Sequence, residues 1–334
     1  MTKELTISIA AYNVEKFLER TLESLVISKD YLERIEVIIV DDGSIDSTSV
    51  IAEKYCRNYP NSFRLIKKEN GGYGSTVNCS IAQAQGKYFK QLDGDDWFVS
   101  ENIELLIDYL SSCNADIVIS PFIMYFESDE TEKVIDKWNK SFDDNSLLQS
   151  NNEIVMAEMC IKTDILKKNN ICLLEKCFYT DFEFVLYSML NSKTFQYFSK
   201  PIYVYRIGRE GQSISLVGIR KNYKDKLKVA MHVINQYTKL AAECPEYIQC
   251  MAVIKIKTLC GDVYNAFMLL DKPMNHYKEI ADFNDELKKN HKEIYKETNE
   301  LNNVRCFRIF PRFLYPVLCN ISIKRLKDRL HVVG

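Results

Sequence analysis

The chain has 334 residues with 27% charged and 46% hydrophobic residues, and its formal net charge is -2. This length predicts about two domains of ordinary globular composition, and the small negative charge argues against nucleic acid as a main partner. The 11 cysteines form no C-x-x-C pair, which is typical of a reduced cytoplasmic protein rather than of a disulfide framework. No secretory signal is visible, and no apolar stretch approaches the ~20 residues of a membrane-spanning helix.

Strand and helix patterns alternate over the first 120 residues. Short apolar and β-branched runs predict strands, and the amphipathic segments between them predict helices. The predicted strands are residues 5–11, 36–40, 63–66, 87–92 and 116–120, and the predicted helices are residues 14–27, 47–59, 75–85 and 101–111. This alternation predicts an α/β fold with a mostly parallel sheet and helices on both faces.

The pattern changes after Pro121. The later predicted elements are a hairpin at 122–127 and 133–138, a helix at 182–190 within the stretch 175–190, and two short strands at 194–206 split at Pro201. Beyond Ser215 the chain is almost wholly helical to about residue 302, and residues 304–330 interleave Arg and Lys with aromatic residues. We therefore expect two domains, residues 1–215 with the sheet and residues 216–334 with helices and a basic aromatic tail.

Four polar clusters follow predicted strands. They are Ala11-Tyr12-Asn13, Asp41-Asp42-Gly43-Ser44, Asn70-Gly71-Gly72-Tyr73-Gly74 and Asp93-Gly94-Asp95-Asp96. Ligands of open α/β sheets bind outside the carboxyl ends of the strands. We therefore expect the four clusters to converge at one edge of the sheet and to form a binding site there.

The last cluster places three carboxylates within four residues. Asp93, Asp95 and Asp96 repel one another unless a cation offsets their charges. Mg²⁺ or Mn²⁺ carrying a phosphorylated ligand is the usual partner of such a set. An acidic turn that caps the next helix is the alternative. An EF-hand loop is excluded, because Trp97 and Phe98 stand where an oxygen ligand and a glycine are needed.

The two middle clusters have chemistry of their own. Asp41 or Asp42 is placed to accept the imide N–H of a uracil or a ribose hydroxyl, although a turn before a helix explains the same residues. Gly71, Gly72 and Gly74 allow a close backbone approach to a phosphate or carboxylate at a helix N-terminus. The loop lacks the lysine of a P-loop nucleotide site.

Taken together, these motifs resemble family 2 glycosyltransferases over roughly residues 3–100. The matching segments are Ile7-Ser-Ile-Ala-Ala-Tyr-Asn13, Glu36-Val-Ile-Ile-Val-Asp-Asp-Gly-Ser-Ile-Asp-Ser-Thr48, Asn70-Gly-Gly72 and Gly86-Lys-Tyr-Phe-Lys-Gln-Leu-Asp-Gly-Asp-Asp96. The resemblance implies the GT-A fold, a nucleotide-binding α/β domain that ends in a D-x-D motif. It identifies Asp93 and Asp95 as this pair, with Asp95 on the metal and Asp93 near ribose and metal.

The same resemblance places Ala10, Tyr12 and Asp42 beside the base and ribose. Two positions depart from the family pattern. Ala10 stands where a proline is common, and Val77 stands where an arginine is frequent in the helix after the glycines. The missing arginine leaves the pyrophosphate contacts open.

The family's catalytic base is an aspartate before an apolar helix, and Thr180-Asp181-Phe182-Glu183 resembles its context. Inverting transfer needs one carboxylate to take the proton of the acceptor hydroxyl. Asp181 is our first choice for this base and Glu183 the second, whereas a helix cap is the alternative role of Asp181.

Residues 205–215 resemble the loop that folds over the nucleotide in such enzymes. Arg206 or Arg209 is placed to bind the diphosphate, because a guanidinium suits bidentate oxyanion binding. A plain β-turn before a helix explains the glycine and serine of this segment equally well.

The resulting prediction is an inverting, metal-dependent glycosyltransferase that uses a nucleoside diphosphate sugar, with UDP preferred. Its acceptor is expected to be a glycan or lipid-linked glycan in cell-surface polysaccharide synthesis. The alternatives are a sugar nucleotidyltransferase, whose arginine-containing loop after strand one is missing here, and a non-catalytic nucleotide-sugar-binding module.

The tail at residues 304–330 has two interpretations. It either lies on the anionic inner face of a membrane, close to a lipid-linked acceptor, or packs its aromatic rings onto the catalytic domain. The role of residues 216–302 and the formation of a homodimer stay open.

Overall fold

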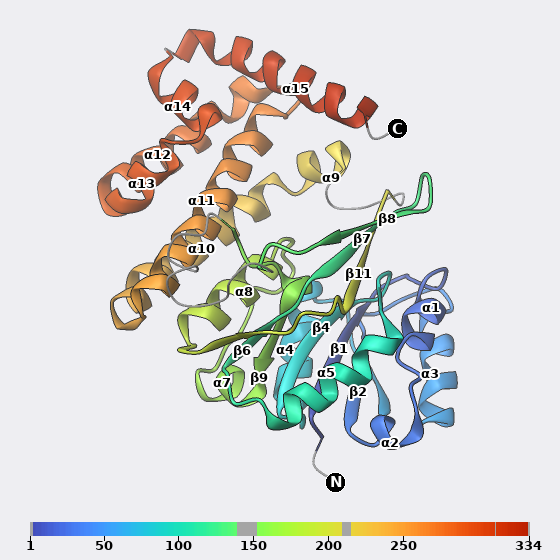
Figure 1. The fold of residues 1–334 in the computed structure, drawn as a ribbon. Helices are drawn as coiled ribbons and strands as arrows, with labels where there is room; N and C mark the ends of the chain where they lie inside the picture. Colours follow the sequence, from blue (N-terminus) through green and yellow to red (C-terminus); the bar gives the residue numbers. More distant parts are fainter. Residues whose placement is uncertain (1–2, 139–151, 209–214, 311, 333–334) are drawn as a thin grey trace.

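A computed structural model describes residues 3–138, 152–208, 215–310 and 312–332. A seven-stranded sheet lies at the centre of the first region (Figure 1). Its order is β10 (Phe195–Tyr197), β6 (Ile117–Ile119), β9 (Met159–Lys162), β4 (Tyr88–Asp93), β1 (Leu5–Ala11), β2 (Ile35–Asp41) and β3 (Phe63–Lys67). Every neighbouring pair is parallel except those of β9, which runs antiparallel to both β4 and β6. The predicted mostly parallel sheet is confirmed, and β9 is an additional strand.

Helices cover both faces of this sheet. One face is covered by α1 (Leu18–Glu23), α3 (Thr48–Asn58) and α5 (Ser100–Ser112), and the other by α4 (Tyr73–Gln83) and α8 (Asp181–Leu190). Successive strand residues point to opposite faces, so Ile117 and Ile119 pack with the second group and Val118 with the first. All seven residues of β2 are buried, as expected for a strand covered on both sides. Two short helices, α2 (Lys29–Leu32) and α7 (Thr163–Lys168), were not predicted.

A second sheet of four strands lies against the first. Its order is β5 (Trp97–Phe98), β11 (Tyr203–Ile207), β7 (Phe122–Phe126) and β8 (Thr131–Ile135). The predicted hairpin is confirmed as the antiparallel pair β7 and β8. The predicted break at Pro201 is also confirmed, because β10 belongs to the large sheet and β11 to the small one. This crossing brings β11 directly beside the acidic turn that follows β4.

The second half is helical, as predicted. Its α-helices are α9 (Leu216–Lys221), α10 (Tyr223–Leu240), α11 (Glu246–Met268), α12 (Tyr277–Asn290), α13 (Lys292–Thr298), α14 (Asn302–Ile309) and α15 (Tyr315–Val332). Helices α10 and α11 pack on α8, and side chains of all three share one hydrophobic cluster. The predicted division at 215/216 therefore separates two parts with a common core. None of the described helices has the length and apolar character to cross a membrane.

One predicted helix is shorter than its apolar pattern indicated, because α1 covers Leu18–Glu23 instead of residues 14–27. The predicted helix at residues 182–190 is confirmed as α8, which starts at Asp181. Before it, Lys176 and Tyr179 have φ values of 50° and 67°. A left-handed backbone cannot belong to a right-handed helix. The segment before Asp181 is therefore an irregular strap, residues 171–180.

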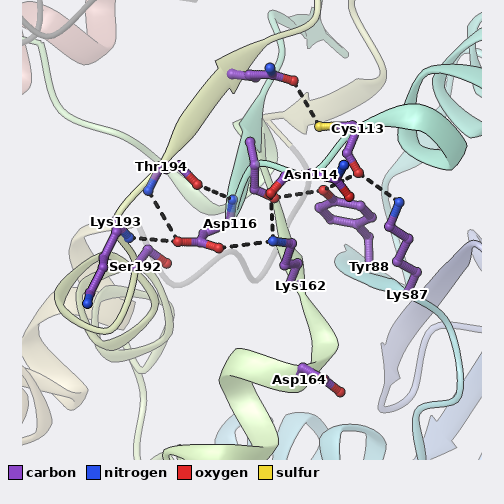
Figure 2. A network of polar contacts seen from close by, with 12 residues as sticks. Lys87, Tyr88, Cys113, Asn114, Asp116, Lys162, Asp164, Ser192, Lys193 and Thr194 are labelled. Atoms are coloured by element: carbon purple, nitrogen blue, oxygen red, sulfur yellow. Dashed lines mark hydrogen bonds and ion pairs between the residues drawn. The ribbon is translucent and has the colours of Figure 1, made fainter.

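A polar network ties the strands together at the amino edge of the large sheet (Figure 2). The carboxylate of Asp116 accepts hydrogen bonds from the backbone N–H groups of Lys193 (2.8 Å) and Thr194 (3.2 Å), and pairs with the Lys162 ammonium at 3.1 Å. Burial by itself raises the pKa of Asp116, but these donors outweigh it and lower that pKa. The network therefore neutralises a half-buried carboxylate in favour of the folded state.

Candidate active site

The strand register brings the predicted clusters to one edge. Ala11 of β1 lies opposite Asp41 of β2, and Ala10 lies opposite Asp93 of β4. Asp41 in turn lies opposite Lys67 at the end of β3, three residues before the glycine-rich loop. The predicted convergence of the four clusters at the carboxyl ends of the strands is therefore confirmed.

The acidic turn after β4 gathers three carboxylates. One carboxylate oxygen each of Asp93, Asp95 and Asp96 lies within 4.8 Å of the other two. Burial and the negative charges of Asp93 and Asp95 raise the pKa of Asp96 well above its ordinary value. An all-oxygen donor set of this kind fits Mg²⁺ or Mn²⁺. Asp93 and Asp95 are half-buried and Asp96 is buried, so the first two are the better ligands.

Strand β11 holds this turn in place. The carboxylate of Asp96 accepts hydrogen bonds from the Tyr203 hydroxyl and from the backbone N–H of Arg206 at 2.8 Å. The Arg206 side chain donates from Nε to the carbonyl oxygen of Asp95 at 3.0 Å and pairs with Glu127 at 3.0 Å. Asp96 is thus a structural residue of the turn, and β11 fixes the orientation of its two neighbours.

The predicted diphosphate role of Arg206 is not supported by this arrangement. Its guanidinium is buried 5.0 Å from the ring centre of Trp97 and 4.9 Å from that of Phe17. The cation is therefore used to brace the acidic turn. Arg209, the other predicted diphosphate ligand, lies outside the described residues.

Asp42 organises the glycine-rich loop. Its carboxylate accepts hydrogen bonds from the backbone N–H groups of Gly71 (2.9 Å) and Gly72 (2.8 Å), and it pairs with Lys68 at 2.8 Å. Both carboxylate oxygens of this buried residue are therefore engaged within the protein. Contact between Asp42 and a base or ribose stays a prediction.

The glycines of this loop serve a contact inside the protein. A Cβ atom on Gly74 would lie 2.1 Å from the carbonyl oxygen of Leu174, and one on Gly72 would lie 3.2 Å from the backbone nitrogen of Lys176. Gly72 also has a φ of 81°, which favours glycine. The loop packs directly on the strap, so the predicted backbone approach to a ligand is not needed to explain these residues.

The loop after β2 is fixed in a similar way. Asp41 accepts hydrogen bonds from the backbone N–H of Ser44 (2.9 Å) and from the Ser49 hydroxyl. Tyr12 is 52% exposed at the end of β1, next to the half-buried Ala10. An open aromatic ring at this edge is a suitable stacking surface for a base, and the contacts of Ala10, Tyr12 and Asp41 with a nucleotide stay predictions.

Two tyrosines connect the acidic turn with Asp181. Burial raises the pKa of Tyr73 well above its ordinary value, and the negative charges of Asp93 and Asp181 add to this rise. Burial likewise raises the pKa of Tyr205, with further contributions from the carboxylates of the acidic turn and from Asp181. The negative charges of the acidic turn and of Asp181 therefore raise the pKa of both tyrosine hydroxyls.

Asp181 is the first residue of α8 and faces two lysines from the helical half. Burial raises the pKa of its carboxyl, and the positive charges of Lys255 and Lys226 limit this rise. The Lys255 ammonium lies 4.5 Å from the ring centre of Phe182, and that of Lys226 lies 4.3 Å from the ring centre of Tyr179. Neither lysine was predicted as a site residue, because residues 216–302 are rich in lysine and give no local signal.

Glu183 is completely buried and holds α8 in place. Its carboxylate accepts hydrogen bonds from the backbone N–H of Leu174 (2.9 Å) and the Tyr187 hydroxyl (3.3 Å), and it contacts Nδ1 of His232. Glu183 therefore joins the strap to α8 and α10. These contacts favour Asp181 over Glu183 as the base.

Comparison with known proteins agrees with this geometry. Residues 6–166 match the family "Glycosyl transferase family 2". The chain is 26% identical over 271 residues to the minor teichoic acid biosynthesis protein GgaB of Bacillus subtilis, covering 78% of this chain and 30% of that relative. It is 34% identical over 135 residues to the putative glycosyltransferase EpsH of the same organism, covering 40% of this chain and 38% of the relative. The chain thus spans well under half the length of these curated relatives.

Solved structures share the fold. S. aureus TarS 1–349 in complex with UDP superposes with a TM-score of 0.65 at 19% identity, covering 97% of this chain and 91% of that one. The mannosyltransferase PcManGT from Pyrobaculum calidifontis in complex with GDP-Man and Mn²⁺ superposes with a TM-score of 0.54 at 12% identity, covering 97% and 87%. The predicted GT-A fold with a helical C-terminal region is confirmed.

Proposed function

As the chain is a family 2 glycosyltransferase, we propose that it transfers a sugar with inversion from UDP to a hydroxyl of a growing cell-surface glycan or lipid-linked glycan. The convergence of Ala10, Asp41 and the acidic turn at one edge of the sheet carries this proposal. The negative charges of the turn and of Asp181, which raise the pKa of both Tyr73 and Tyr205, support it. Binding of UDP by TarS and the role of GgaB in teichoic acid synthesis support the donor and the class of acceptor.

Asp93 and Asp95 are the residues that would hold Mn²⁺ or Mg²⁺. A divalent ion there supplies positive charge that stabilises the departing diphosphate. Asp96 and Arg206 keep the two ligands in place through the contacts of β11 with the turn. Ala10, Tyr12, Asp41, Asp42 and Gly72 line the edge at which the base and ribose are proposed to bind.

Asp181 acts as the general base. The acceptor oxygen attacks the anomeric carbon while Asp181 takes its proton, and the bond from that carbon to the diphosphate oxygen breaks. The nucleoside diphosphate leaves with the bonding electron pair, and attack from the opposite side inverts the anomeric configuration. A carboxylate whose pKa is raised by burial is a stronger base. The positive charges of Lys255 and Lys226 limit that rise.

The proposal is tested with the full chain and a panel of UDP-sugars. Release of UDP in the presence of an acceptor extract is measured with Mn²⁺, with Mg²⁺ and after metal removal. We expect Asp95→Asn to abolish the metal-dependent turnover, whereas the exposed Asp164→Asn, a matched control, retains it. Metal-independent turnover, or full activity of the Asp95 variant, contradicts the proposal. Pyrophosphate release from UTP would instead identify a nucleotidyltransferase.

A further inference from the structure

The C-terminal segment has a charge balance unlike that of the whole chain. Residues 304–330 hold seven of the 44 Lys and Arg residues but one of the 46 Asp and Glu residues. The segment comprises most of α14, the short helix η4 (Arg312–Leu314) and most of α15. It lies at the end of the molecule opposite the N-terminus (Figure 1). A strongly basic segment thus occupies one end of a chain whose net charge is -2.

One side of this segment is firmly packed. The buried Phe307 ring lies 5.2 Å from that of Tyr264 in α11, and the buried Tyr315 ring lies 5.1 Å from that of Tyr277 in α12. The alternative prediction that the tail packs its aromatic rings onto the catalytic domain is wrong for Phe307 and Tyr315, because their partners are helices of the second half. These contacts fix the orientation of the segment's other side.

The other side exposes large apolar side chains. Phe313 of η4 is 75% exposed, and Val317 and Ile321 of α15 are 53% and 44% exposed. The spacing of four residues places Val317 and Ile321 on one face of α15. Exposed Ile309 and Phe310 precede them. We refer to these five residues as the apolar face.

A groove adjoins the apolar face. Phe310, Val317 and Ile321 line this groove, which has a volume of about 360 Å³, together with Met268 and Leu318. Phe310, Val317 and Ile321 therefore belong to one apolar surface, and exposed Ile309 and Phe313 are close to them in the sequence. Scattered single apolar residues are normal on a protein surface, whereas a contiguous apolar patch marks an interaction site.

We propose that the apolar face docks on the surface of an anionic lipid bilayer. Exposed Arg305, Arg312 and Lys324 accompany the apolar residues. A helix that combines large apolar side chains with basic residues binds at the boundary between headgroups and acyl chains, and each basic residue adds attraction to anionic lipid.

The charge pattern favours a bilayer over a second copy of the chain. A two-fold interface would bring the same basic residues together from both subunits. Their like charges would repel, whereas anionic headgroups attract them. The inference does not depend on the donor, the metal or the base.

The test is flotation of the full chain with two kinds of vesicle, one of phosphatidylcholine alone and one containing a quarter phosphatidylglycerol. We expect the wild type to float with the anionic vesicles and to be released at high salt. The variant Phe313→Ser/Val317→Ser/Ile321→Ser should float at least about ten-fold less. The matched control Leu105→Ser/Val134→Ser removes exposed apolar residues from α5 and β8 and should float like the wild type.

A second variant, Arg305→Gln/Arg312→Gln/Lys324→Gln, changes exposed charges and keeps the apolar face, so it decides the matter if the first variant does not fold. It should lose its preference for anionic vesicles. Absence of wild-type flotation, or equal flotation of both variants and wild type, overturns the proposal. Sedimentation that shows a dimer lost in the serine variant, without vesicle binding, overturns it in favour of self-association. All readouts are free of sugar nucleotide, so failure here leaves the proposed transfer untouched.

Discussion

At the amino edge of the large sheet, Asp116 is surrounded by backbone N–H donors and by Lys162, whereas at the carboxyl edge Asp93, Asp95 and Asp96 lie within 4.8 Å of one another. The two edges belong to the same sheet, although the contacts of Asp116 lie at the ends of β6, β9 and β10 and the acidic turn follows β4. Their effect on a carboxyl group is opposite, because the pKa of Asp116 is lowered and that of Asp96 is raised.

The difference shows where the protein uses negative charge for stability and where it retains charge for function. The donors around Asp116 compensate its charge inside the folded chain, so this carboxylate stabilises the protein. Burial and the negative charges of Asp93 and Asp95 raise the pKa of Asp96, which costs stability unless a cation binds. A carboxyl group with a pKa raised in this way is typical of functional sites. Variants at the two edges should therefore separate activity from stability.

The largest effect is expected for Asp181→Asn. The amide cannot take the acceptor's proton, so the transfer rate should fall by about 10²–10⁴-fold. Binding of UDP should be unchanged, because the proposed donor contacts lie on the strand ends. Rates with saturating donor and acceptor, with UDP affinity from calorimetry, give the comparison. A variant that transfers sugar at the normal rate would move the base elsewhere.

A somewhat smaller loss of transfer, by about 10²–10³-fold, is expected for Asp95→Asn. Removing one of three mutually repelling charges should leave the metal-free melting temperature unchanged or higher. Initial rates over a range of Mn²⁺ concentrations and thermal melting without metal test both parts. A lower melting temperature with intact transfer would make this carboxylate structural and break the comparison.

The opposite outcome is expected for Asp116→Asn. It should lower the free energy of unfolding by about 1 kcal/mol at neutral pH, after allowance for solvent screening, and leave the transfer rate per folded molecule unchanged. Because the folded-state pKa is lowered, the stabilisation by Asp116 is present above the unfolded-state pKa and is lost as the pH falls through the folded-state value. Urea unfolding at several pH values should show wild type and variant converging in acid.

The smallest effect, a few-fold change in rate, is expected for Lys255→Met. The charge of Lys255 lowers the pKa of Asp181, so its removal raises that pKa further. The base is active when ionised, and the acidic limb of the profile of kcat/KM should therefore move to higher pH, with recovery in alkali. Lys257→Met on the same helix removes a lysine paired with Glu300 and is the control. An unchanged profile would show that the helical half does not tune the base.

Much of the sheet was predictable from local pattern. Residues 36–40 are an unbroken β-branched run, which is the signal of a strand buried on both faces, and parallel strands necessarily bring their terminal loops to one edge. For this reason the amino-acid sequence alone predicts correctly that Asp41 and Asp93 lie at this edge. The helix at 182–190 was also predictable from its apolar pattern, and α8 starts one residue earlier, at Asp181.

The features that escaped prediction depend on contacts between distant segments. Gly74 is required by the carbonyl of Leu174, about one hundred residues further along the chain, and not by a ligand. Arginine is a common ligand of oxyanions, but Arg206 lies in β11, where its guanidinium binds the carbonyl oxygen of Asp95 and the carboxylate of Glu127. Lys255 is one of many helical lysines until packing shows that it faces Asp181. Local sequence patterns predict helices, strands and strand ends, whereas the roles of Gly74, Arg206 and Lys255 depend on contacts between distant segments.

The cluster shared by α8, α10 and α11 bears on how such enzymes diversify. The charges of Lys226 and Lys255, from the helical half, lower the pKa of Asp181. That half therefore cannot be exchanged without changing the proposed base. In a chimera joined between β11 and α9, the helical half would come from a relative. Such an exchange would change the charges around Asp181 as well as any specificity for the sugar acceptor. We therefore expect such chimeras to be active when the new helical half has lysines, or other cations, at the positions of Lys226 and Lys255.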